Sequence, residues 1–503
     1  MAEKKNESMS SVDVAWLRMD RPHNLMVICG VLVLHERITL ARLRSTIAIR
    51  FLRFGRFRQR PLPTMSGFQW QTDAHFDLAR HVKRVALPRG AGDAELEALV
   101  SRLVSAPLDP RHPLWQFQLV ASYKGGSAVV LRIHHCYADG IALIQVLLSM
   151  TDADRAGTRA GPQASPQSRR ADGETDPLAR LFAPLAGVLD VASKAGSTLL
   201  EKGAQIWRDP ARAVALAEQG GAFTAELAKL ALMSEDSATR FKGKPRVAKR
   251  VAWADPIPLD EVKAIGKALG ASINDVLLSS VAGALRAYLV GRGDAVDGVV
   301  IRALVPVNLR PLDQAYRLGN KFGLVFLDLP VGIENPVARL YAVRANMHAL
   351  KGSYQPIIAL GILAAMGAGP QVLQEQLLAM LAKNATAVMT NVPGPQQPLY
   401  FASARIDRLL FWVPQSGDIG MGVSIMTYAG DVQFGMITDR SLCPDPERVI
   451  ENFAPEFEKL ALATLLSPWP WRVPPSAAEI ERAVFRRAEF IRPRPGANKF
   501  GPT

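Results

Sequence analysis

The chain has 503 residues, of which 49% are hydrophobic, and its formal net charge is +14 at pH 7. This length and apolar content indicate a globular chain with two domains or one large two-lobed domain. The three cysteines are far apart and show no CxxC spacing, which disfavours a disulfide framework and a structural zinc site and fits a reducing cytosol.

The N-terminal stretch MAEKKNESMSSVDV is polar and no apolar run follows it closely, so we expect no signal peptide. A basic stretch comes next, between Arg37 and Thr72. It contains no acidic residue, and Phe51, Phe54 and Phe57 lie among its eight arginines. Such a stretch can contact lipid headgroups or a substrate phosphate, stack on nucleic-acid bases, or form a solvated helix face. Of these we expect no role in nucleic-acid binding.

The first half, residues 1–151, mixes strand-like and helical patterns. Strands are predicted over Leu25–Leu34, Phe117–Ala121 and Ala128–Ile133, and a helix over Asp93–Ser105. Residues 152–177 are rich in Ala, Gly, Pro, Ser and Arg, which indicates a flexible linker. Helical spacing then continues to about residue 240, so 152–240 is predicted to be a linker and helical connector.

An α/β pattern returns in residues 241–466, with helices predicted over Leu259–Leu269 and Ile273–Leu289 and strands over 298–309 and 322–330. Residues 356–369 are apolar but too short to span a membrane, so we expect a buried or interfacial helix there. Residues 467–503 form a basic tail.

The stretch IHHCYADGIAL, residues 133–143, places two histidines and an aspartate among apolar residues. Residues 127–133 have the pattern of a strand, and the apolar spacing after Gly140 is helical, so Asp139 is predicted to cap a helix. This strand, turn and helix would project one imidazole into a cleft, where it could act as a general base. The alternative from these residues alone is a buried polar pair beside a capping aspartate.

Two other chemistries do not fit the spacing. The histidines are adjacent and lack the HExxH pattern of a zinc protease, so we expect no metal. GVSIM, residues 422–426, lacks the second glycine of a GxSxG nucleophile elbow. Cys136 is predicted to be a packing residue.

Several motifs occur in a family-specific order: PLW at Pro113, Leu114 and Trp115, HHxxxDG over residues 134–140, ND at Asn274 and Asp275, LVPVNLRP over 304–311, GNKFG over 319–323, TNVPGP over 390–395 and TYAGDVQFGMITD over 427–439. In these motifs the chain resembles the bacterial wax ester synthase/diacylglycerol acyltransferase family, within the chloramphenicol-acetyltransferase-like (CAT-like) superfamily of CoA-dependent acyltransferases. The resemblance covers residues 10 to about 466; the long connector and the tail depart from it.

The resemblance implies an α/β (α+β) fold of two CAT-like lobes, each a mixed sheet with helices, and an active-site tunnel between them. It implies transfer of a long-chain acyl group from acyl-CoA to diacylglycerol or a fatty alcohol, with acyl-CoA as a substrate and no cofactor. It also implies peripheral contact with the inner face of the membrane or with lipid inclusions.

Carried over by motif, His135 is the general base, His134 is its neighbour, and Asp139 and Gly140 hold the loop, with Arg302 or Arg310 as the partner of Asp139. Pro113, Leu114 and Trp115 are expected in the core or in the tunnel wall. Asn274 and Asp275 either order a helix end or contact substrate, since Ser272 precedes them as a cap. Asn391 lies in a rigid loop that the resemblance brings near the active site.

Two rival interpretations of the sequence remain. One is an enzyme of the same fold with another hydroxyl acceptor. The other is a catalytically silent lipid-binding protein, against which the intact HHxxxDG motif counts.

Overall fold

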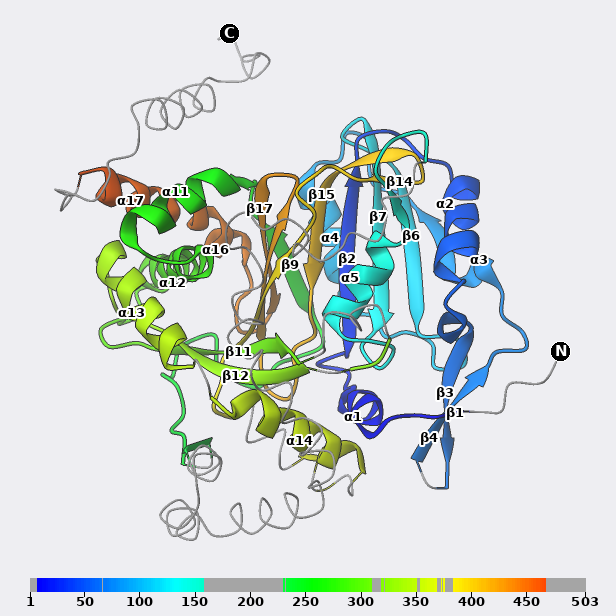
Figure 1. The fold of residues 1–503 in the computed structure, drawn as a ribbon, viewed down its shortest axis with the longest axis horizontal. Coiled ribbons are helices and arrows are strands. Elements are labelled where there is room, and N and C mark those ends of the chain that lie inside the picture. Colours follow the sequence, from blue (N-terminus) through cyan, green and yellow to red (C-terminus); the bar gives the residue numbers. More distant parts are fainter. Residues whose placement is uncertain are drawn as a thin grey trace.

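The computed structural model describes residues 7–65, 67–157, 229–230, 232–309, 318–320, 322–350, 353–368, 372, 374–375 and 383–466. These residues form two seven-stranded sheets, each with helices packed on it, and a small three-stranded sheet at one side (Figure 1). The predicted tail and most of the predicted connector lie outside the described residues.

The N-terminal sheet has the strand order β5-β6-β7-β2-β15-β14-β8. Its strands are β5 (Val82–Val85), β6 (Trp115–Tyr123), β7 (Gly126–His134), β2 (Val27–Leu34), β15 (Ala404–Trp412), β14 (Tyr400–Phe401) and β8 (Thr151–Asp152). β7 is buried along its whole length. It can be buried on both faces because the sheet is covered by α2 (Leu40–Thr46), α3 (Leu78–His81), α4 (Asp93–Val104) and α5 (Gly140–Leu148), while α1 (Ser11–Met19) lies below the end of the strands.

The C-terminal sheet has the order β10-β17-β16-β13-β11-β12, and β9 also pairs with β17. Its strands are β9 (Lys249–Trp253), β10 (Ile257–Pro258), β11 (Ile301–Asn308), β12 (Phe322–Leu329), β13 (Ala387–Pro393), β16 (Met421–Tyr428) and β17 (Asp431–Asp439). The helices of this half are α11 (Leu259–Leu269), α12 (Ile273–Gly291), α13 (Pro336–Ala349), α14 (Gln355–Ala368), α16 (Glu447–Glu451) and α17 (Phe453–Leu466). Most of them lie together on one side of the sheet (Figure 1).

Helix α12 is the central helix of this group. It is the one helix of the described residues that is long and apolar enough to cross a bilayer, but 78% of its most apolar window is buried inside the protein. It packs against α13 and α17, as the core helix of a globular half does. The predicted helix near 356–369 is α14, which packs on α1 and β12.

Strands β14 and β15 belong to the N-terminal sheet although they come from the second half of the chain. β15 pairs antiparallel with β2, with Trp412 opposite Cys29, and β14 pairs with β8. Residues 241–466 therefore do not form one separate lobe as predicted, because 400–412 complete the first sheet. Alternating hydrophobicity identifies the buried face of a strand but not its partner, which is why the sequence did not indicate this exchange.

A second link joins helix α4 of the first half to the edge strand β9 of the second. Three side chains, spaced four residues apart along α4 and at its C-terminal end, accept hydrogen bonds from backbone N–H groups of alternate residues of β9. Glu97 accepts from Trp253 at 3.1 Å, Ser101 from Val251 at 3.0 Å and Ser105 from Lys249 at 2.9 Å. We call this set the α4–β9 clasp. It satisfies edge-strand donors that would otherwise lack partners.

The basic stretch is divided between buried and exposed side chains. It includes α2, the helical turns Ile47–Phe51 and Gly55–Arg58, and β3 (Gln59–Thr64), which pairs with β4 (Gly67–Thr72), itself paired with β1 (Glu7–Ser8). Phe51 and Phe57 are fully buried and stack at 3.9 Å between ring centroids. Those two rings are therefore core residues, so the interpretation of this stretch as a phenylalanine-studded surface for lipid was wrong for Phe51 and Phe57.

Half of the arginines in this stretch are half-buried and bonded within the chain. Arg50 pairs with Asp152 at 2.8 Å and Arg56 with Glu7 at 2.8 Å, while Arg44 and Arg60 donate to backbone carbonyls. The four exposed ones are Arg37, Arg42, Arg53 and Arg58.

Candidate active site

The HHxxxDG segment has the predicted arrangement of strand, turn and helix. β7 ends at His134, and α5 begins after Asp139, whose Oδ1 accepts the Ala142 N–H at 2.9 Å. The carboxylate lies at the positive end of the helix dipole, which favours its charged form. The turn of residues 135–139 is thereby fixed at both ends.

His135 lies in this turn and is almost completely buried, with 5% of the residue exposed. Its backbone N–H donates to the Met26 carbonyl at 2.7 Å. Its ring stacks on Trp16 of α1, at 3.9 Å between centroids and 19° between planes, and Phe322 of β12 lies 5.7 Å away. Aromatic contacts from both halves of the molecule therefore hold the imidazole at their junction.

Burial sets the protonation state of both histidines. Desolvation lowers the pKa of His135 to about 4 and that of His134 to about 3, where the neighbouring His135 adds a smaller effect. A backbone contribution and the Asn320 side chain oppose the lowering of the His135 pKa. Both rings are therefore neutral at pH 7, and a neutral ring is the form that can accept a proton.

His134 orders the turn. Its Nδ1 accepts the Cys136 N–H at 3.1 Å, which places the ring proton on Nε2. Asp20 Oδ1 is 3.8 Å from that Nε2 and accepts the Met26 N–H at 2.7 Å. Cys136 is fully buried, in agreement with the packing role predicted for it.

A short segment of the second half runs alongside the turn of residues 135–139. The Asp139 N–H donates to the Gly319 carbonyl at 3.3 Å, and the Gly319 N–H donates to the Tyr137 carbonyl at 3.2 Å. The next residue, Asn320, donates its Nδ2–H to the His135 carbonyl at 2.9 Å and to Asp13 Oδ1 at 2.8 Å. Residues of both halves thus form the site, as expected, while the tunnel stays a prediction.

The proposed arginine partners of Asp139 have different outcomes. Arg302 pairs with Asp328 at 2.6 Å and donates to the carbonyls of Ser234 and Asn384, so its guanidinium is engaged within the second half, and that prediction was wrong. Its position on the buried strand β11 explains this, because a strand neighbour supplies the carboxylate. Arg310 lies outside the described residues.

The PLW motif lies in the core beneath the turn. The Leu114 carbonyl accepts the His134 N–H at 2.9 Å, and the Leu114 N–H donates to Tyr137 Oη at 3.0 Å. Trp115 is fully buried and donates its indole N–H to the Phe57 carbonyl at 2.7 Å, and Pro113 is also buried. Of the two expectations for this motif, the core position is the one found.

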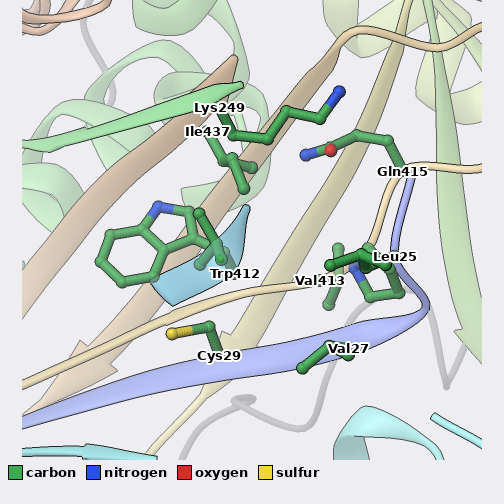
Figure 2. A pocket seen from close by; sticks show the side chains of 10 residues that line it. Leu25, Val27, Cys29, Lys249, Trp412, Val413, Gln415 and Ile437 are labelled. Carbon is green, nitrogen blue, oxygen red and sulfur yellow. The ribbon is translucent and has the colours of Figure 1, made fainter. Parts of the chain in front are cut away.

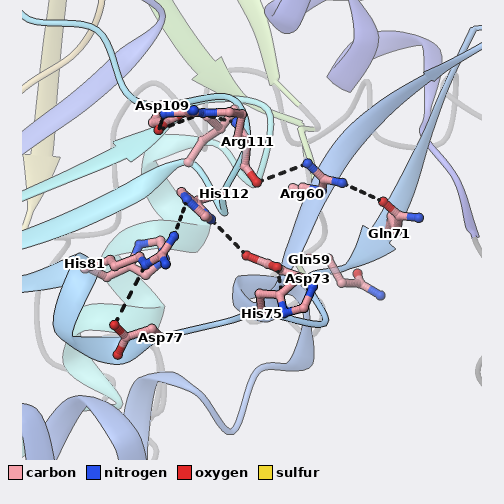
Figure 3. Close-up of polar contacts among 12 residues, drawn as sticks. Gln59, Arg60, Gln71, Asp73, His75, Asp77, His81, Asp109, Arg111 and His112 are labelled. Atoms are coloured by element: carbon pink, nitrogen blue, oxygen red, sulfur yellow. Dashed lines mark hydrogen bonds and ion pairs between the residues drawn. The ribbon is translucent and has the colours of Figure 1, made fainter.

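A polar cluster beside this motif joins helix α3 to the loops that carry Asp73 and His112 (Figure 3). His112 Nε2 accepts from Arg80 at 2.8 Å, and its Nδ1 donates to Asp73 at 3.2 Å. His81 donates from Nδ1 to the Trp115 carbonyl at 2.8 Å and stacks on that indole. Both nitrogens of His112 are used in packing the loops together.

The ND and TNVPGP motifs meet each other. Asp275 accepts the Ser272 N–H at 2.8 Å and donates its own N–H to the Ser272 hydroxyl, so it completes a capping box at the start of α12. Asn274 accepts a hydrogen bond from the Asn391 side chain. Asn391 lies within the strand β13 and not in a loop as predicted. Because β13 runs parallel to β11, Asn391 lies toward the end of the sheet at which β12 starts with Phe322.

Gly140 opens α5 and is partly exposed. A Cβ atom at this position would meet no other atom within 4 Å, so protein packing does not require a glycine there. Its φ is not positive, so the backbone does not require one either. Among the described residues, no group of three or more His, Cys, Asp and Glu side chains is arranged to hold a metal ion.

A small cavity of about 20 Å³ lies between β2, β15 and the C-terminal sheet (Figure 2). Its lining includes Val27, Cys29, Trp412, Gln415 and Lys249. It has room for about one water molecule, so it is too small to be the predicted tunnel.

Sequence reasoning missed Asp13, Trp16, Asn320 and Phe322 as parts of this site. The GNKFG motif contains two of them, but it was noted only as part of the resemblance. Asp13 and Trp16 lie in a short helix more than 110 residues before the histidines, and no spacing rule connects the two segments.

Comparison with known proteins identifies the family. The wax ester synthase/diacylglycerol acyltransferase catalytic domain matches residues 9–277, and the C-terminal domain of the same family matches residues 318–461. The chain belongs to the wax ester synthase/diacylglycerol acyltransferase family. It is therefore an acyltransferase, of the family that carries out acyl transfer for triacylglycerol or wax ester synthesis.

Individual relatives agree with this assignment. A putative diacylglycerol O-acyltransferase of Mycobacterium tuberculosis is 31% identical over 429 residues, which cover 80% of each chain. A probable diacylglycerol O-acyltransferase of the same organism is 28% identical over 405 residues, 78% of this chain and 81% of that one.

Solved structures confirm the fold. The wax ester synthase/diacylglycerol acyltransferase of Marinobacter aquaeolei VT8 aligns with a TM-score of 0.64 and 20% identity, covering 91% of this chain and 100% of that one. The first condensation domain of the CDA synthetase aligns with a TM-score of 0.54 and 16% identity, covering 92% and 98%. The predicted mixed α/β fold of the CAT-like type is thereby confirmed.

Proposed function

We propose that this family member transfers a long-chain fatty acyl group from acyl-CoA to the free hydroxyl of diacylglycerol or of a fatty alcohol, with His135 as general base. The observation that carries this proposal is a neutral, buried imidazole held at the junction of the two halves of an acyltransferase. The relatives named as diacylglycerol O-acyltransferases support diacylglycerol as one acceptor.

The proposed reaction is a direct transfer. The His135 imidazole takes the proton of the acceptor hydroxyl as its oxygen attacks the thioester carbonyl carbon. The carbon–sulfur bond then breaks, and the imidazolium returns the proton to the CoA thiolate. The scheme requires no metal, cofactor or acyl-enzyme.

Entry of substrate requires space beside the His135 ring. The ring is closed in by Trp16 and Phe322 in the described structure. Burial in this apolar surround suits the chemistry, because water would compete with the alcohol for the thioester.

The test replaces His135→Ala and measures CoA thiol release and lipid product from palmitoyl-CoA with dioleoylglycerol and, separately, with hexadecanol. We expect turnover to fall about 10²- to 10⁴-fold, the range that a general base contributes. His348→Ala, at an exposed position of α13, is the matched control and should retain full activity.

Undiminished turnover by the His135→Ala variant would refute the mechanism. No turnover by the unmodified protein with either acceptor would favour a lipid-binding role instead. Competition between the two acceptors measures the preference for triacylglycerol or wax ester synthesis.

We also propose that the protein works at the cytosolic face of the membrane or on lipid inclusions. Its acceptors are insoluble in water, its net charge is +14, and four arginines of the basic stretch are exposed. Ile49 and Met65, which is at the turn between β3 and β4, are exposed apolar side chains of the same region.

A further inference from the structure

Asn320 has no part in the mechanism above, although it contacts the proposed base. Only 6% of the residue is exposed, and its Nδ2 donates at 2.8 Å to Asp13 Oδ1 and at 2.9 Å to the His135 carbonyl. It therefore connects three segments: helix α1, the catalytic turn and the segment before β12.

The orientation of the Asn320 amide follows from these bonds. Both neighbours of Nδ2 are acceptors, so the nitrogen must face them and the Oδ1 must lie on the other side. Asn320 Oδ1 is buried and has no hydrogen-bond partner among the described residues, and the same holds for His135 Nδ1. It is uncommon for two residues in contact each to have a buried polar atom without a hydrogen-bond partner, because each such atom lowers the free energy of unfolding by about 1–3 kcal/mol.

An acceptor beside the base would be useful when the base becomes charged. In the reaction, one ring nitrogen takes the hydroxyl proton and the other carries a proton throughout. The imidazolium then has N–H donors on both nitrogens. A nearby amide oxygen can accept the second N–H without adding a charge to the buried site.

We propose that Asn320 is a positioning residue for the acyl transfer: it holds the His135 backbone through Nδ2 and accepts the His135 Nδ1–H through Oδ1 as the imidazolium forms. The proton from the acceptor then goes to Nε2 and returns from Nε2 to the CoA thiolate. This inference rests on the proposed function, since it assigns Asn320 a role only if His135 is the base.

Asp13 completes the arrangement. Its carboxylate holds the Asn320 amide nitrogen, and its own N–H is bonded to the Ser10 hydroxyl that caps α1. Trp16, one turn further along the same helix, stacks on the imidazole. Helix α1 therefore fixes both the plane of the base and the amide that supports it.

The test compares Asn320→Ala with Asn320→Asp in steady-state assays with palmitoyl-CoA and dioleoylglycerol. We expect Asn320→Ala to lower kcat about 10- to 100-fold, part of the general-base contribution, with KM for palmitoyl-CoA within about two-fold. We expect Asn320→Asp, which keeps the acceptor oxygen but loses the amide donor, to lower kcat as well and to shift the acid limb of kcat/KM toward higher pH by about one unit or more, because a carboxylate beside the ring raises its pKa.

Asn346→Ala is the matched control. Asn346 lies in α13, and its side-chain amide also donates to a backbone carbonyl, that of Asp328, at 2.8 Å. It should leave kcat and the pH profile unchanged. Thermal unfolding of each variant separates lost activity from lost folding.

Two results would overturn the inference. The first is a kcat of Asn320→Ala within two-fold of that of the unmodified protein. The second is a loss of activity that comes with a lower unfolding temperature, while the acid limb of the pH profile of Asn320→Asp stays where it is in the unmodified protein. Neither result touches the proposed function if His135→Ala is inactive. An active His135→Ala variant would remove the proposed function itself.

Discussion

At the scale of single residues, the environment of His135 favours orientation over basicity. The ring is stacked on Trp16, has Phe322 tilted beside it and is kept neutral by burial, so it is a weak base held in one plane. A weak base still serves this reaction if the alcohol and the thioester are held against it, because proximity supplies much of the rate.

The pH dependence of activity should reveal this burial. The base works deprotonated, so activity is lost as the pH falls through its pKa, which burial lowers to about 4. We expect kcat/KM to be flat from pH 8 to about pH 5, measured with circular dichroism at each pH to confirm folding. Half-loss of activity near pH 6.5, with the protein still folded, would contradict the buried environment.

Trp16 should matter for catalysis as well as for packing. We expect Trp16→Phe, which keeps an aromatic face against the imidazole, to retain most of the activity, and Trp16→Ala to lose at least about ten-fold in kcat. The Ala variant should also lose roughly 3–5 kcal/mol of unfolding free energy, as large aromatic truncations in cores do. Equal activities of the two variants, measured in urea-free buffer and normalised to folded protein, would show that the Trp16 ring has no role in catalysis.

At the scale of secondary-structure elements, the α4–β9 clasp connects the two halves through a titratable group. Glu97 accepts the Trp253 N–H, and its pKa is raised to about 7, first by burial and then by Asp93 and Glu447, while Arg250 opposes the rise. The folded state therefore binds a proton between about pH 4.5 and 7 that the unfolded state has released. By linkage, the stability of the fold decreases as the pH rises through this window.

Glu97→Gln tests this linkage because glutamine keeps the acceptor oxygen and cannot ionise. We expect the unfolding temperature of the unmodified protein to fall between pH 5 and 8 and that of the variant to fall less. Glu95→Gln, at an exposed position on the same helix, is the control. An identical slope in Glu97→Gln and the unmodified protein would show that Glu97 is not the group responsible.

The elements themselves were largely predictable, because each was encoded locally. Leu259–Leu269 is α11 as predicted, and Ser272 correctly marks the start of α12. The turn that carries His135 followed from the switch of apolar spacing at Asp139. Trp16 and Asn320 could not be found in this way, because their contacts with His135 join segments that are distant along the chain.

At the scale of the whole molecule, the exposed arginines allow a test of the proposed contact with lipid. Replacing Arg37, Arg42, Arg53 and Arg58 together by alanine should weaken binding to vesicles with anionic lipids, by about 1 kcal/mol for each arginine that lies near the surface. Flotation with phosphatidylglycerol-containing and purely zwitterionic vesicles at low and high salt measures this. Binding that is equal for both vesicle types and insensitive to salt would assign membrane contact to apolar groups instead.

The domain plan was the least predictable feature at this scale. Residues 400–412 have a strand pattern, yet nothing local indicates that β15 pairs with β2 rather than with its sequence neighbours. Pairing between strands this far apart in sequence depends on the completed tertiary structure.

The exchange of β14 and β15 affects the order of events during synthesis. When β2 has left the ribosome, several hundred residues must still be synthesised before its partner β15 is complete. At ~5–20 residues per second this synthesis takes on the order of a minute. During that interval the nascent first half exposes an apolar, unpaired strand, which is a template for aggregation. We therefore expect expression of the first half alone to yield insoluble protein, because β2 then has no strand to pair with on the side that β15 occupies.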